Sequence, residues 1–140
     1  MDAGAHVDVE RAERERAARR ARSWLNFAAA YLVAAGGMSL IWGLVALANK
    51  SAFHEGGLVW SKLDTWGPIA LAVGGAQILA AILVVQRRFA GQWLAGVLAA
   101  LGILFHFLTL GAYPAWSVIA LVANGLVLWA ITAQGDEFDD

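Results

Sequence analysis

Residues 67–86 read GPIALAVGGAQILAAILVVQ, and residues 93–133 read WLAGVLAALGILFHFLTLGAYPAWSVIALVANGLVLWAITA. Between Gly67 and Gly135 the only charged residues are Arg87 and Arg88, which stand together between these two stretches. About 20 apolar residues are enough for a helix to cross the roughly 30 Å hydrocarbon core of a bilayer. The sequence therefore predicts membrane-spanning helices on both sides of the arginine pair.

The second stretch is about twice as long as one membrane crossing requires. It is interrupted by Gly111 and by Tyr113-Pro114, and glycine is common just past a helix end while proline is common just inside a helix start. A further apolar stretch lies at residues 24–49. We therefore predict an all-α fold, a four-helix transmembrane bundle with short loops. The predicted spans are about 24–49, 67–86, 93–110 and 115–133.

Charged residues concentrate at the two ends of the chain, although the composition is 60% hydrophobic and only 15% charged. Soluble domains are typically about 25% charged. Residues 1–23 alternate acids with arginines, and residues 136–140 are acidic. No apolar stripe runs through residues 9–22, which argues against a helix lying on the membrane surface. We expect a charged N-terminal segment that forms a frayed or solvated extension of the first span, a transmembrane domain at 24–135 and an acidic tail.

The distribution of basic residues predicts the orientation of the spans, because basic residues prefer the cytoplasmic flanks of membrane helices. Six arginines precede Trp24, and Arg87 and Arg88 fall on the same predicted side, whereas the other side holds only Lys50 and Lys62. We predict a multi-pass protein of the cell (plasma) membrane with both termini in the cytoplasm. Its predicted partners are the lipid bilayer and either a second copy or another membrane protein. Acids nearly as numerous as arginines in residues 1–23 argue against a nucleic-acid partner.

No motif for catalysis or for a cofactor stands out. The chain has no cysteine, which excludes disulfides, thiolate metal sites and cysteine nucleophiles. His54, Glu55 and Asp64 of the predicted outer loop match no metal-site spacing and are interpreted as solvated surface. A haem site with paired histidines is disfavoured because only His106 lies within a span. We therefore expect no enzyme activity, no cofactor and no metal.

Four polar side chains form a candidate intramembrane layer: Ser39, Gln77, His106 and Asn124. Counting about 1.5 Å per residue from the outer ends places Ser39, Gln77 and Asn124 near the midplane, with His106 about one turn nearer the outside. The structural interpretation of this layer is that its polar side chains form hydrogen bonds between the helices. The functional interpretation is a polar solute path or a proton-bearing site. Proton coupling is disfavoured because no span contains Asp or Glu.

Small residues recur at helical spacing, and such residues let membrane helices approach closely. The repeats are Ala35, Ser39 and Gly43; Ala72, Ala76 and Ala80; and Gly96 with Ala100.

Several runs of sequence resemble a family of small four-helix bacterial membrane proteins, mostly actinobacterial, with no assigned function. The runs are LDTWG at 63–67, QWLAGV at 92–97, AYPAWS at 112–117 and WAITAQG at 129–135. The resemblance covers about residues 24–135 and implies a four-helix plasma-membrane protein. It supplies no catalytic residues. The family pattern often has an acidic residue where this chain has Asn124, which weakens an argument for charge at that position.

Two functions remain as hypotheses from the sequence. The first is a structural or accessory component of a membrane assembly without catalytic activity. The alternative is a subunit of an oligomeric small permease or channel that uses the midplane polar layer. A membrane-embedded enzyme ranks third, because it lacks a candidate nucleophile or metal triad.

Overall fold

The computed structural model describes residues 3–48 and 63–138, and within these residues it is almost entirely helical. Its elements are α1 (Ala3–Ala48), α2 (Leu63–Val85), α3 (Phe89–Leu108), α4 (Pro114–Ala133) and a short 3₁₀-helix, η1 (Gly135–Glu137). All four α-helices are long and apolar enough to cross a membrane. The predicted all-α fold with four membrane helices is confirmed. Residues 49–62 lie outside the described residues, and they include His54, Glu55 and most of the predicted outer loop at 50–66.

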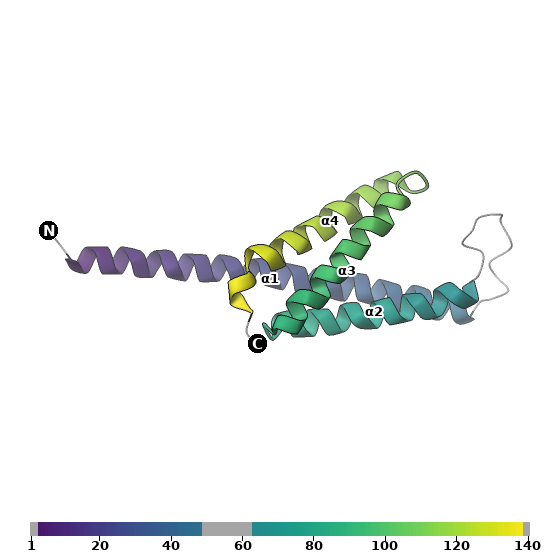
Figure 1. Cartoon of the computed structure of the whole chain (residues 1–140), viewed down its shortest axis with the longest axis horizontal. Coiled ribbons are helices and arrows are strands. Elements are labelled where there is room, and N and C mark those ends of the chain that lie inside the picture. Colours follow the sequence, from purple (N-terminus) through teal and green to yellow (C-terminus); the bar gives the residue numbers. More distant parts are fainter. Residues whose placement is uncertain (1–2, 49–62, 139–140) are drawn as a thin grey trace.

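Helix α1 continues without a break from the charged N-terminal segment into the first membrane span. Its 46 residues correspond to roughly 69 Å of helix, about twice the thickness of a bilayer core. Residues 6–20 are all exposed, and they project away from the other helices in Figure 1. The charged residues 6–20 are therefore an exposed extension of the same continuous helix that contains the first span.

Two helix starts lie earlier than the hydropathy pattern indicated. Helix α2 begins at Leu63 rather than near Gly67, and α3 begins at Phe89 rather than near Trp93. The difference arises because apolar residues mark the lipid core, while helical hydrogen bonding continues into the polar flanks. The turn between the two helices is therefore short. Within it Arg87 adopts a left-handed backbone conformation with φ of 57°.

The helices form two antiparallel hairpins, α1–α2 and α3–α4 (Figure 1). In the first hairpin, two glycines of α1 lie against the backbone of α2, and these two contacts are seven residues apart along each helix. A Cβ atom on Gly36 would lie 2.9 Å from the carbonyl oxygen of Gly74, and one on Gly43 would lie 2.9 Å from that of Gly67. These contacts explain why glycine occupies the positions, since any side chain would push α1 and α2 apart.

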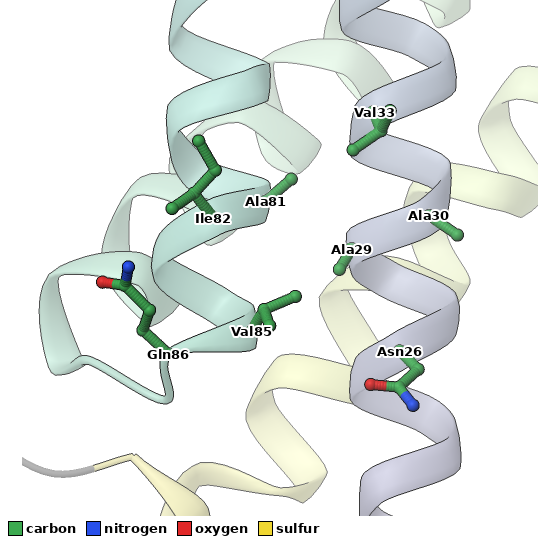
Figure 2. Close-up of a pocket in the computed structure, with 8 residues that line it drawn as sticks. All are labelled: Asn26, Ala29, Ala30, Val33, Ala81, Ile82, Val85 and Gln86. Carbon is green, nitrogen blue, oxygen red and sulfur yellow. The ribbon is translucent and has the colours of Figure 1, made fainter.

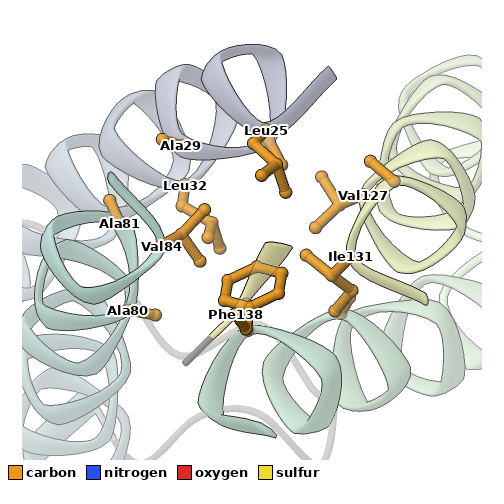
Figure 3. Close-up of a cluster of buried hydrophobic side chains, with 13 residues drawn as sticks. Leu25, Ala29, Leu32, Ala80, Ala81, Val84, Val127, Ile131 and Phe138 are labelled. Atoms are coloured by element: carbon orange, nitrogen blue, oxygen red, sulfur yellow. The ribbon is translucent and has the colours of Figure 1, made fainter. Parts of the chain in front are cut away.

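The two hairpins share a buried core at one end of the molecule, which we call the Arg87 end because it carries the α2–α3 turn. Every residue of this core from α1 to α4 comes from the part of its membrane span nearest that turn (Figure 3). The core residues are Leu25, Ala28, Ala29, Leu32, Ala80, Ala81, Val84, Ala95, Ala99, Val127, Ala130, Ile131 and Phe138.

At the opposite end, which we call the open end, the hairpins diverge (Figure 1). Each close contact described at this end joins parts of the same hairpin and not the two hairpins to each other. Gly43 packs against Gly67 in the first hairpin, and Thr109 lies 3.3 Å from Ser117 in the second. The four helices therefore enclose a common core over only part of their length.

Residues 135–138, which follow α4, pack under the Arg87 end. Phe138 is 9% exposed and belongs to the core (Figure 3). Glu137 forms an ion pair with Arg87 of the α2–α3 turn. The acidic composition of residues 136–140 predicts a charged tail, but it does not indicate that Phe138 attaches this segment to the core.

Candidate functional site

The predicted polar layer begins with a contact across the α1–α2 hairpin. The Ser39 hydroxyl donates to Gln77 Oε1 over 3.4 Å, and both side chains are half-buried. A bond of this length is at the weak limit of hydrogen-bond geometry. The pair links two helices that Gly36 and Gly74 already hold close together.

Asn124 lies on α4 and connects the two hairpins. Its Nδ2 donates to the Tyr31 hydroxyl of α1 over 3.0 Å and to the Ala120 carbonyl of its own helix over 2.8 Å. The side chain is only 6% exposed. A Cβ atom on Gly102 of α3 would lie 2.6 Å from Asn124 Oδ1. Asn124 is therefore enclosed by three helices.

His106 bonds to its own helix. Its Nδ1 lies 2.8 Å from the carbonyl oxygen of Gly102, one turn earlier on α3. One turn later, Thr109 contacts Ser117 at the start of α4. Ser117 is fully buried, so this contact closes the α3–α4 hairpin near its turn.

The structure brings together only two of the four residues of the predicted layer. Ser39 meets Gln77, whereas Asn124 meets Tyr31, which lies eight residues before Ser39 on α1. Eight residues of helix correspond to about 12 Å along the axis. The similar depth predicted for Asn124 and Ser39 came from counting residues along each span, and in the structure the two side chains have different partners.

Tyr31 is the residue of this site that the sequence analysis missed. A tyrosine hydroxyl buried within an apolar span usually has a hydrogen-bond partner, and that was the available signal. The sequence offered no way to choose Asn124 among the possible partners, because the choice depends on how the hairpins cross.

The polar side chains are satisfied within the chain. No buried side-chain nitrogen or oxygen lacks a hydrogen-bond partner in residues 6–48 and 66–138, whose side chains the structure describes. Within the same residues, no three His, Asp or Glu side chains gather as metal ligands do. This arrangement of polar side chains can hold the helices together. Each hydrogen bond between membrane helices contributes roughly 0.6–2 kcal/mol to the free energy of their association.

The Arg87 end carries the aromatic and charged groups expected where a membrane meets water. Trp24 and Trp129 make an edge-to-face contact with ring centroids 4.8 Å apart. Gln92 donates to the carbonyl oxygen of Ile131 over 3.0 Å, and Arg87 pairs with Glu137 close by. These contacts tie the end of α4 to the middle of α1 and to the start of α3, and they tie η1 to the α2–α3 turn.

Comparison with known proteins identifies the family of this chain. No curated protein and no solved structure matches it. A family model described as a domain of unknown function, DUF7144, matches residues 24–136. That range contains the membrane part of α1, the helices α2 to α4 and the first residues of η1. Because the match covers most of the sequence, the chain belongs to the family of the domain of unknown function DUF7144.

Proposed function

We propose that this protein is a structural or accessory component of a membrane assembly and has no catalytic activity of its own. One observation carries the proposal: the two hairpins share a core only at the Arg87 end and diverge toward the open end (Figure 1). Large apolar side chains lie exposed on the diverging parts, among them Met38 of α1 and Ile119 of α4. A second copy or another membrane protein packs against these faces.

Packing rather than the hydrophobic effect drives helices together in lipid, because lipid tails are as apolar as the side chains. Diverging hairpins forgo packing that a parallel four-helix bundle would have. A partner helix at the open end recovers van der Waals contact for both hairpins at once. The Arg87 end needs no such partner, because the shared core already supplies van der Waals contact between the hairpins there.

The hydrogen bonds of the polar residues support a packing role over a transport role. Ser39 bonds Gln77, Asn124 bonds Tyr31, and His106 bonds Gly102. A polar path needs side chains that can exchange these partners for a solute. Solute flux in proteoliposomes that disappears in Asn124→Leu would favour the permease alternative, and we expect no such flux.

Photocrosslinking tests the proposal directly. The chain has no cysteine, so a single cysteine carries the crosslinker at a chosen position. Met38→Cys and Ile119→Cys probe the open end, and Val97→Cys, also exposed, is the control near the Arg87 end. We expect a protein adduct of defined mass from the first two and a weaker one from the control. Adducts with lipid alone at all three positions would contradict the proposal.

We further propose that the protein lies in the plasma membrane with both termini in the cytoplasm. The support is the arginines of the α1 extension and of the α2–α3 turn, which fall on the same side of the helices. In intact cells, a membrane-impermeant maleimide is expected to label Ala112→Cys in the α3–α4 turn. It should label Ala17→Cys of the extension only after the cells are opened, and the reverse result would invert the orientation.

A further inference from the structure

An apolar groove of about 400 Å³ lies between α1 and α2 near the Arg87 end (Figure 2). Ala29 and Ala81 are buried and form its floor. The exposed side chains of Ala30, Val33 and Ile82 line it together with Val85. The groove is therefore open to the lipid that surrounds the helices.

Two amides stand at the end of the groove nearest the α2–α3 turn. They are Asn26 of α1 and Gln86, which directly follows α2 (Figure 2). The lining thus changes from purely apolar to hydrogen-bonding as it approaches the place where α1 leaves the apolar stretch. Trp24, two residues before Asn26, belongs to the aromatic residues that prefer this interfacial depth.

Arginines continue the same face of α1 beyond the amides. Arg22 precedes Asn26 by one helical turn, and Arg19 precedes it by seven residues, so both lie in line with the groove. Both are exposed. Arg16 and Arg20 are exposed at a similar distance from the membrane, but helix geometry places them about 90° and 130° away from the groove. Glu15 stands one helical turn before Arg19, whereas no acid lies within four residues of Arg22 along α1.

We propose that this groove binds one anionic phospholipid. The apolar part holds an acyl chain, Asn26 donates a hydrogen bond to the ester region, and Arg19 and Arg22 bind the phosphate. The order of these groups along α1 follows the order of groups in a phospholipid, from tail to headgroup. Guanidinium groups suit phosphate because they bind it with paired hydrogen bonds as well as charge.

The size of the groove favours a lipid over a protein helix. Its lining on α1 runs from Asn26 to Val33, about 10 Å along the axis. A helix about 10 Å across would occupy roughly twice the volume of the groove over that length. The floor is also closed to deeper entry, because Ala29 and Ala81 pack within the core.

Native mass spectrometry of the full chain in detergent tests the proposal. The protein is titrated with phosphatidylglycerol and with phosphatidylcholine of the same acyl chains. The headgroup variant is Arg19→Gln with Arg22→Gln, and its matched control is Arg16→Gln with Arg20→Gln on the other faces of α1. The groove variant is Ala30→Leu, and its control is Ala100→Leu on the exposed face of α3.

We expect phosphatidylglycerol to bind more tightly than phosphatidylcholine. A basic residue near an anionic lipid contributes about a factor of five, so the headgroup variant should lose roughly 25-fold in affinity for phosphatidylglycerol. Its control should stay within about twofold of the unaltered chain, given this geometry. Ala30→Leu should weaken both lipids, and Ala100→Leu neither.

Three results would overturn the proposal. The first is equal affinity for the two lipids, and the second is an equal loss in both arginine variants, which would indicate general attraction to the charged extension. The third is a change of oligomeric mass, without loss of lipid, in Ala30→Leu, which would assign the groove to a second copy. Unchanged thermal unfolding of the arginine variants keeps the comparison valid.

Discussion

At the scale of single residues, Asn124 contributes the clearest specific link between the hairpins. Its Nδ2 donates to Tyr31 and to the Ala120 carbonyl, which fixes the position of Oδ1 against Gly102. The sequence identified Asn124 as one of the polar residues of the membrane part. It did not identify Gly102, because the need for glycine there follows only from the neighbouring side chain.

Gly102→Ala tests this contact. The new Cβ would lie 2.6 Å from Asn124 Oδ1, and moving Asn124 away would break two hydrogen bonds. We expect a loss of about 1–3 kcal/mol in the free energy of unfolding. Gly125→Ala is the control, because a Cβ there has nothing within 4 Å. Thermal unfolding of the purified proteins measures both, and equal stability would show that α3 does not press on Asn124.

At the scale of elements, the α1–α2 hairpin depends on glycines one heptad apart, Gly36 and Gly43 on α1 facing Gly74 and Gly67 on α2. The sequence predicted small-residue packing on the first span and named Gly43. The predicted repeat had a spacing of four residues, Ala35, Ser39 and Gly43, and therefore did not include Gly36. Sequence spacing shows which residues share a face, but the partner helix decides which of them it touches.

Gly36→Ala and Gly74→Ala are expected to weaken this hairpin. A Cβ at either position would come within 2.9 Å of a backbone carbonyl oxygen, which cannot turn aside as a side chain can. We expect each change to cost about 1–3 kcal/mol of stability.

The adjacent glycines provide matched controls for these two variants. Gly37→Ala and Gly75→Ala place a Cβ in open space. They should be neutral or stabilising by up to about 1 kcal/mol, because alanine favours helix more than glycine does. Equal effects of Gly36→Ala and Gly37→Ala on the unfolding temperature would refute the close approach of α1 and α2.

At the scale of the whole molecule, hydropathy predicted the number and order of the helices but not how the two hairpins meet. Length and apolarity determine which segments cross the bilayer. The divergence of the hairpins and the burial of Phe138 depend on contacts between residues far apart in the sequence. Both features follow from the location of the shared core at the Arg87 end.

Phe138→Ala is expected to loosen the Arg87 end. Removing a largely buried phenylalanine costs about 3 kcal/mol, at the low end of the usual range because Phe138 lies at the margin of the core. Glu137→Gln removes an ion pair whose side chains are 31% and 28% exposed, and such pairs contribute less than about 1 kcal/mol. Thermal unfolding should therefore rank the two changes clearly. A larger effect of Glu137→Gln would mean that charge, not burial, holds the chain end.

We propose above all that this protein works by associating with other membrane proteins or with itself. The most direct measurement is the mass and composition of the tagged full chain, extracted from its own membrane in native lipid particles and identified by mass spectrometry. We predict a particle with a second copy or another integral membrane protein in fixed proportion to the 14.9 kDa chain. Single copies of the chain surrounded only by lipid would contradict the account.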